Sequence, residues 1–262
     1  MNGSLLAAAI VLVIGAGVWM RRVLTVARFG CRQTQRWPLL VLPGIGVAVL
    51  WVVLMFWADP EVRKGDELYF PLFLGVGLIW VFLARIFFRW LNLDCERDAL
   101  AGRNPAAVWA CAGAMLAVEL AYAGGNIGAG DETVTTFVSA GLATGAVFIL
   151  WFAVEKAARP SEAITVERDL AAGVRFAGML VALGLISGRA VAGDWVSLLA
   201  TVRDFVRDGW FALPVALSAS VVERWLQPKS APSPGVFLTG VLPALAYLAA
   251  AGIWLVHLGS WR

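Results

Sequence analysis

Eight long apolar segments constrain this chain more than any other feature of its sequence. They cover roughly residues 4–20, 38–58, 68–90, 105–124, 134–155, 170–192, 209–226 and 236–258. A helix needs about 20 mostly apolar residues to cross the hydrocarbon core of a bilayer. The chain is 60% hydrophobic and only 15% charged, whereas soluble domains are about 45–50% apolar and about 25% charged. The sequence therefore predicts an all-α membrane protein with about eight transmembrane helices and no soluble domain of useful size.

Two copies of one pattern lie 65 residues apart at the centre of the chain. Seven of the 18 positions in 103–120 are identical to those in 168–185, and each copy has a polar start, small residues and an apolar helix. This period fits one helical hairpin, and repeats of this kind indicate architecture. We predict a single polytopic domain over residues 1–262. It would contain four repeated, parallel hairpins, at about 4–58, 68–124, 134–192 and 196–258.

The distribution of Lys and Arg predicts the orientation of these helices, because cytoplasmic loops carry the excess of positive charge. The regions 21–37, 85–103, 155–169 and 224–235 hold 14 cations, while the alternate loops and the C-terminus hold six. Both termini are therefore predicted outside, with the basic loops in the cytoplasm. The first segment lacks a basic n-region and a cleavage site, which favours a retained signal anchor.

The stretch from Val196 to Asp208 differs from the apolar segments. Its polar residues recur at helical spacing, with leucine, valine and phenylalanine on the other face, which predicts an amphipathic helix. Such a helix lies along the outer interface, caps the bundle or lines a polar lumen.

Several classes of site are excluded by the residue counts. His257 is the only histidine, so this chain alone cannot build a bis-His haem site, an HExxH zinc site or a Ser-His-Asp triad. The three cysteines show no CxxC spacing. Basic runs interleaved with aromatic residues, typical of nucleic-acid surfaces, are absent. We expect no catalytic residues, no cofactor, no metal and no nucleic-acid partner.

At Gly102-Arg103-Asn104-Pro-Ala-Ala and Glu167-Arg168-Asp169-Leu-Ala-Ala the chain resembles the YjfL-type family of bacterial inner-membrane proteins, domain of unknown function 350. The resemblance covers about residues 68–195. It implies a four-helix unit, a bacterial inner-membrane location and association with envelope-stress or membrane-remodelling partners. Asp169 stands where the family usually has Asn. The family supplies no established catalytic residues.

Glu119 is the sharpest candidate for a functional side chain. A carboxylate inside a membrane helix costs roughly 2.5–3.5 kcal/mol on insertion scales, so it must be neutral, paired or facing water. Arg189 lies at a similar depth in the matching repeat helix and is the expected partner. The pair is either part of a proton or cation site or a buried ion pair that locks the two repeat helices together.

Arg175 lies one turn inside its segment, and we expect it to snorkel to the cytoplasmic interface. The alternative is a contact with Asp169, Glu167 or a lipid phosphate. Asn104 and Asp169 precede their helices by one residue and are expected to cap them. The bolder alternative is a shared cytoplasmic vestibule built from Arg103, Asn104, Arg168 and Asp169.

Small residues follow both polar starts, so the repeat helices are expected to pack closely on each other or on another subunit. The glycine-rich stretch 124–130 is interpreted as a tight turn. A partly polar stripe on segment 134–155 faces a neighbouring helix or a narrow wet path.

Together these features favour a non-enzymatic inner-membrane protein that acts as an oligomeric scaffold or envelope-stress component. The lipid bilayer, further copies of the chain and partner membrane proteins are its expected partners. The alternative function is a channel or transporter for protons, cations or small cationic solutes, with Glu119 and Arg189 in its path.

Overall fold

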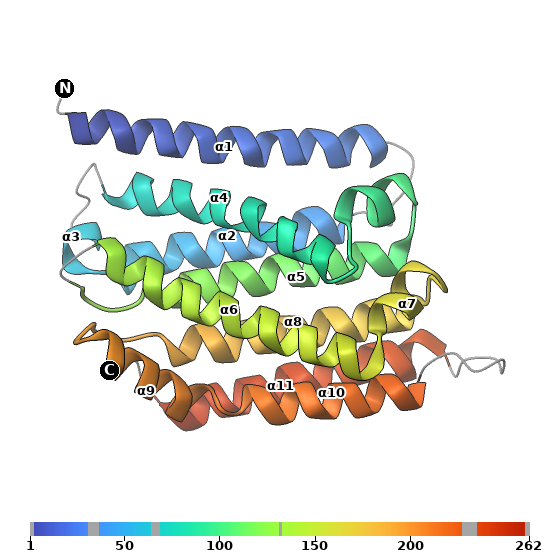
Figure 1. The fold of residues 1–262 in the computed structure, drawn as a ribbon. Coiled ribbons are helices and arrows are strands. Elements are labelled where there is room, and N and C mark those ends of the chain that lie inside the picture. The colour runs from blue at the N-terminus through green and yellow to red at the C-terminus, as the bar shows by residue number, and fades with distance from the viewer. Residues whose placement is uncertain (1–2, 31–36, 64–68, 131–132, 227–234, 260–262) are drawn as a thin grey trace.

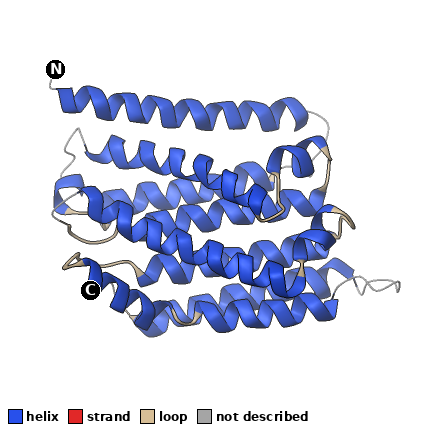
Figure 2. Ribbon diagram, viewed as in Figure 1, coloured by secondary structure: helices blue, strands red, loops and turns tan. Residues whose placement is uncertain are grey.

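The computed structural model describes residues 3–30, 37–63, 69–130, 133–226 and 235–259, and within them every regular element is a helix (Figures 1 and 2). The long helices are α1 (Gly3–Gly30), α2 (Pro38–Phe56), α4 (Tyr69–Trp90), α5 (Pro105–Gly124), α6 (Thr133–Ala158), α8 (Leu170–Ala190), α10 (Ala212–Leu226) and α11 (Leu242–Leu258). The shorter helices are α3 (Pro60–Arg63), η2 (Cys95–Ala101), α7 (Pro160–Thr165), α9 (Leu198–Gly209) and η3 (Phe237–Val241). Of these, η2 and η3 are π-helices.

Seven helices in the described ranges are long and apolar enough to cross a membrane, and the number is eight if the bent pair α9–α10 is one span. The chain is therefore a multi-pass membrane protein. The predicted segments agree with the helices to within three residues, with one exception. Helix α1 continues ten residues beyond its predicted end at residue 20, because the arginines that follow are good helix formers and do not stop a helix.

The long helices form two layers (Figure 1). In one layer α2 packs on α5, α5 on α8, and α8 on α11. In the other, α1 packs on α4 and α6 packs on α10, while Trp80 of α4 donates a hydrogen bond to Thr144 of α6 at 3.1 Å. Helices α5 and α8 are buried over most of their length and form the centre of the bundle.

Glycine and alanine hold α5 and α8 close together. Gly113 lies against Ala177, and Gly184 lies against Ala117, so closely that an added Cβ atom would overlap the facing helix. Small residues permit this approach in a bilayer, and the expected packing of the two helices on each other is confirmed. Gly178 faces Ala244 of α11 instead.

The connections that lead into α5 and α8 follow one backbone plan. Each has a left-handed residue (Asn92 at φ 62°, Arg159 at φ 49°) and then a short helix, η2 or α7. Each ends in a left-handed arginine directly before the capping residue. These connections and the described parts of the other basic loops lie at one end of the bundle, called here the basic end (Figure 1).

The glycine-rich loop 124–130 at the opposite end does more than turn the chain. Gly128 (φ 107°) packs against Gly193 (φ 143°), and the Ala129 N–H donates to Asp194 Oδ1 at 2.7 Å. The Gly128 N–H also donates to the carbonyl of Trp57 at 3.0 Å. The loop therefore joins the ends of three helices.

Helix α9 confirms the amphipathic helix expected over 196–208. Ser197 caps it by accepting a hydrogen bond from the Ala200 N–H at 3.2 Å. Leu198, Leu199 and Val206 are exposed. The apolar face is thus on the outside of this bundle, as an interfacial helix requires, and Arg203, Asp204 and Arg207 of the polar face are exposed as well. The choice between an interfacial helix, a cap and a lumen lining stays a prediction. Several residues used in the predictions lie outside the described residues: Cys31, Arg32, Arg36, Lys64, Lys229 and Arg262.

Candidate functional site

Glu119 projects from α5 into a notch on α2. Its side chain is only 3% exposed, and it lies against Gly46, where a Cβ atom would overlap the carboxylate. Neither carboxylate oxygen has a hydrogen-bond partner among the described residues. A buried carboxyl group without a partner costs more free energy than almost any other buried group. This site, formed by Glu119 and Gly46, is called here the Glu119 notch.

The expected pair between Glu119 and Arg189 is not formed, so that prediction is wrong. Arg189 Nη2 reaches the carbonyl of Gly259, after α11, at 3.4 Å. The Glu119 side chain points away from Arg189 and α8. Residue 119 lies on the face of α5 that contacts α2, while the neighbouring face of α5 packs on α8. The contact between α5 and α8 consists of small residues and contains no ion pair that holds them together.

The charged side chain that interacts with Glu119 is Arg22 of α1. Arg22 Nη2 donates to the carbonyl of Leu39, while its Nη1 is buried and has no hydrogen-bond partner among the described residues. The guanidinium group also lies 4.8 Å from the centre of the Trp19 ring. Glu119 thus has Arg22 as an electrostatic neighbour, with no hydrogen bond between them.

A pocket of about 100 Å³ begins at Arg22 and extends toward the basic end. Its charged lining residues are Arg21, Arg22, Arg85 and Glu96, and Met115 of α5 lines it as well. This cavity is called here the arginine pocket. Since one water needs about 10–15 Å³ of such volume, the pocket has room for several.

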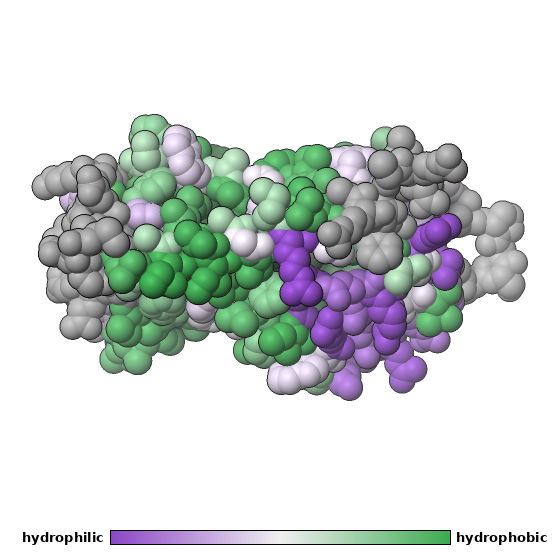
Figure 3. Space-filling view, turned by 90° about the horizontal axis from the view of Figure 1, so that it is seen from above, coloured by the Kyte–Doolittle hydropathy of each residue, from purple (hydrophilic) through white to green (hydrophobic). Residues whose placement is uncertain are grey.

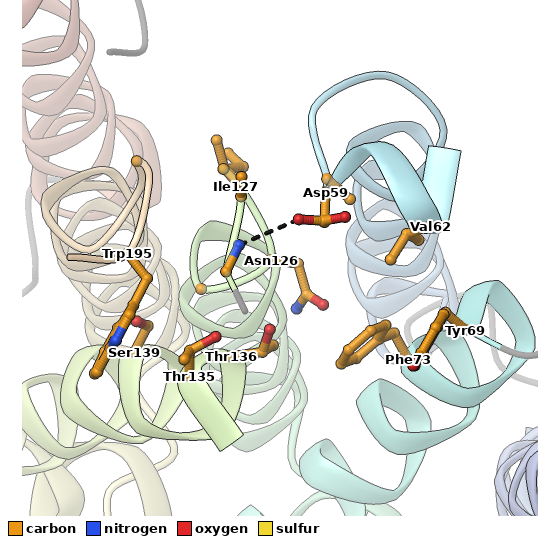
Figure 4. A pocket seen from close by; sticks show the side chains of 16 residues that line it. Asp59, Val62, Tyr69, Phe73, Asn126, Ile127, Thr135, Thr136, Ser139 and Trp195 are labelled. Atoms are coloured by element: carbon orange, nitrogen blue, oxygen red, sulfur yellow. Dashed lines mark hydrogen bonds between the residues drawn. The ribbon is translucent and has the colours of Figure 1, made fainter. Parts of the chain in front are cut away.

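A second pocket, of about 70 Å³, lies at the opposite end of the bundle (Figure 4). Its polar lining includes Asp59, Asn126, Thr135, Thr136 and Ser139, and it is called here the loop pocket. The dashed line in Figure 4 marks the hydrogen bond from the Gly130 N–H to Asp59 Oδ2, at 3.2 Å. The threonines and the serine belong to the polar stripe expected on segment 134–155, so that stripe faces a polar cavity.

One face of α5 runs from the first pocket to the second. Met115 lines the arginine pocket, Glu119 lies one turn further along, and Asn126 lines the loop pocket. Between the last two lies Tyr122, whose buried hydroxyl donates to the carbonyl of Phe73 at 2.9 Å. Residues 115, 119 and 122 share one face of α5, and Asn126 lies two residues after the end of this helix. At 1.5 Å per residue, Glu119 is about 6 Å from Met115 along the axis.

Asn104 and Asp169 cap α5 and α8, as expected. Asn104 Oδ1 accepts from the N–H groups of Ala106 and Ala107, at 3.0 and 3.4 Å, and Asp169 accepts from the Ala171 N–H at 2.9 Å. The Asn104 amide also donates to the carbonyl of Ile164 at 2.7 Å. Arg103 and Arg168, just before the caps, have exposed side chains. A shared vestibule of these four residues stays a prediction.

Arg175 does not snorkel, and that prediction is wrong. Its side chain is fully buried and binds both carboxylate oxygens of Glu223 on α10, at 2.8 and 2.7 Å. Its Nη1 donates to the carbonyl of Thr239 in η3 at 2.9 Å and lies 4.0 Å from Asp169. Snorkelling would expose the guanidinium group, whereas α10 and η3 cover it and satisfy its donors.

Sequence reasoning missed Gly46, Arg22 and Glu223. Glu223 carries a signal that could have revealed it, because it is a carboxylate within an apolar segment, like Glu119. Gly46 carries none, since a glycine in an apolar helix does not show which side chain fills the space beside it.

Asp94, outside the membrane spans, caps η2 at the basic end. Partial burial disfavours its charged form, but hydrogen bonds from the N–H groups of Arg97 and Glu96 outweigh this and lower the pKa of Asp94. Arg89 Nε lies 3.0 Å from the same carboxylate and acts in the same direction. The charged form of Asp94 therefore stabilises this connection.

Comparison with known proteins places the centre of this bundle in a family. No curated protein and no solved structure matches the chain. One family model matches residues 65–191, a range that contains α4 to α8, Glu119 and both capping residues. Arg22, Gly46 and Glu223 lie outside it. The match agrees with the resemblance seen in the sequence: residues 65–191 of this chain are a domain of the DUF350 family, a domain of unknown function.

Proposed function

We propose that this protein is a non-enzymatic membrane protein that moves protons across the bilayer, with Glu119 as the intramembrane proton-binding site. The observation that carries the proposal is a buried carboxyl group without a hydrogen-bond partner, between polar pockets toward opposite ends of the bundle. Ionisable residues inside a membrane are costly, and they mark substrate, ion and proton pathways.

A purely structural role gives a poor account of Glu119. A structural carboxylate in an apolar region needs a partner that offsets its desolvation. The expected lock between α5 and α8 is absent, and glycine and alanine already supply close packing there. The ion pair that would have given Glu119 a structural role is therefore absent, which favours the proton site.

A proton suits this site better than a metal ion. The Glu119 notch offers one carboxylate, while metal ions such as Ca²⁺ and Mg²⁺ take six or more oxygen ligands. The nearby Arg22 guanidinium would repel a metal cation. The same guanidinium stabilises the charged carboxylate after a proton leaves, so the two protonation states of Glu119 can interchange.

The pockets and Tyr122 supply the rest of the path. Water in the arginine pocket would exchange protons with Glu119 from the basic end, and water in the loop pocket would do so from the other side. The Tyr122 hydroxyl can both donate and accept hydrogen bonds. It lies between Glu119 and the loop pocket, whose lining includes its acceptor residue, Phe73.

The proposal also includes the arrangement of the helices as repeated hairpins. Four repeated hairpins, each with one helix in either layer, would account for the matching connections before α5 and α8. With the basic end in the cytoplasm, the loop pocket would open to the outside of a bacterial inner membrane.

The test is proton flux in liposomes that contain the purified protein and a pH-sensitive dye, driven by a potassium diffusion potential. Wild-type protein should acidify or alkalinise the lumen according to the sign of the potential, and E119Q should lose most of this flux. E155Q is the matched control, because Glu155 is also buried but bonds Ser161 at the basic end, away from the path. Wild-type flux no faster than in empty liposomes, or equal flux in E119Q, would overturn the proposal.

A further inference from the structure

Among the described residues, the lining of the arginine pocket carries a net positive charge. Three guanidinium groups, of Arg21, Arg22 and Arg85, meet a single carboxylate, Glu96. Glu96 already pairs with Arg85 at 2.9 Å and lies 3.8 Å from Arg89 outside the pocket. Buried Nη1 of Arg22 has no hydrogen-bond partner among the described residues. The excess of guanidinium groups over carboxylates makes the cavity attractive to an anion.

The rest of the lining is apolar apart from Thr25. Val18, Leu39, Phe82, Leu100 and Met115 form its walls. Next to the pocket, α1 and α4 expose large apolar side chains, among them Met20, Leu24, Leu83 and Ile86. Figure 3, which views the α1 side of the molecule, shows a patch of hydrophilic residues beside a largely hydrophobic surface. The pocket thus lies where a charged group and hydrocarbon chains can bind together.

Its depth in the bundle fits the headgroup region. Arg21 and Arg22 lie four or five residues inside the end of the span Leu6–Val26, and Arg85 lies five residues inside the end of Tyr69–Trp90. At 1.5 Å per residue this is about 6–8 Å from the helix ends. Long arginine side chains reach a lipid phosphate from such a position.

We propose that the arginine pocket binds a phosphate group, supplied by an anionic phospholipid of the leaflet at the basic end. Guanidinium groups match phosphate oxygens in geometry and charge. Basic pockets between transmembrane helices on the cytoplasmic side suit anionic headgroups. Arg21 and Arg85 would bind the phosphate from two helices, and the charge of Arg22 beside them would add to the attraction. The proposal rests on the pocket lining and not on proton movement.

The experiment measures thermal unfolding of the full-length protein in detergent with added lipid. One arm adds phosphatidylglycerol, one adds zwitterionic phosphatidylcholine and one adds inorganic phosphate. A ligand that binds only the folded state raises the unfolding temperature. Phosphatidylglycerol should do so, with a half-effect concentration at least about tenfold below that of phosphatidylcholine. If inorganic phosphate has the same effect at the same concentration, the site takes free phosphate, and the phosphate chemistry still holds.

Two variants make the result specific. R21Q should weaken the phosphatidylglycerol effect about tenfold, and it should fold, because the Arg21 side chain is exposed and forms no hydrogen bond or ion pair with another described residue. R224Q is the control, since Arg224 is an exposed arginine near the same end that donates to the carbonyl of Ala157 outside the pocket. No stabilisation by either anion, or equal stabilisation of R21Q and wild type, would overturn the proposal.

Discussion

Gly46 and Glu119 share one space inside the bundle, because the Glu119 carboxylate lies where a side chain on residue 46 would be. The space beside Gly46 on α2 is therefore filled by the Glu119 side chain of α5. This relationship connects an apolar helix outside the DUF350 domain to the candidate proton site inside it.

Substituting Gly46 by alanine should displace the Glu119 side chain. Overpacking of a buried site costs typically 1–3 kcal/mol, so G46A should be less stable by about that amount. The cost should fall in an E119A background, where the carboxylate is gone, and a double-mutant cycle should give a coupling energy of about 1 kcal/mol or more. Thermal unfolding in detergent measures all four proteins. Strictly additive effects would show that Gly46 does not shape the site.

The glycines between α5 and α8 should be far less tolerant than the glycines of α6. In G184A the new Cβ atom would overlap the Ala117 backbone, so the helices must separate at a cost of about 1–3 kcal/mol. Gly141 and Gly145 have nothing within 4 Å of such an atom, and G141A and G145A should be neutral or slightly stabilising. Equal stability of G184A and G145A would contradict the close contact.

Removing one partner of the buried pair Arg175–Glu223 should lower the stability of the protein strongly, whereas replacing both partners by apolar residues should lower it little. Removal of one partner leaves an unpaired buried charge, so E223Q should lose about 3–5 kcal/mol, while R175M combined with E223L should lose much less. The exposed Arg207–Asp204 pair is the control, and R207Q should change stability by less than about 1 kcal/mol. A double variant as unstable as E223Q would show that the pair is needed for more than neutralisation.

Acid should loosen the connection before α5. Because the folded-state pKa of Asp94 is lowered, its charged form contributes stability above its unfolded pKa of about 3.9, and this contribution is lost as the pH falls through the folded value. Hydrogen exchange of the peptide over residues 94–101 should therefore be less protected at about pH 3 than at pH 6, after correction for intrinsic exchange. D94N should remove that pH dependence. An unchanged pH dependence in D94N would assign it to another group.

Much of this fold could be predicted from the sequence, because each level of it depends on local signals. Apolar length predicts the spans, Asn104 and Asp169 predict two helix starts, and small residues predict the close contact of α5 with α8. The candidate site could not be predicted in this way, because its composition depends on which face of each helix contacts which neighbouring helix. Glu119 was identified as costly, but its position on the α2 side of α5 separates it from Arg189, and no pattern in one sequence shows that choice. Arg175 was misjudged for the same reason, since its partner lies 48 residues away on α10.

The most direct test of the central claim is to measure proton flux and thermal unfolding on one preparation of E119Q beside the wild type. Glutamine keeps the shape of the side chain and removes its proton chemistry. A proton site without a structural partner predicts that flux is lost while the unfolding temperature is unchanged or higher. Unchanged flux with a lower unfolding temperature would contradict the account and would make Glu119 a structural residue of the bundle.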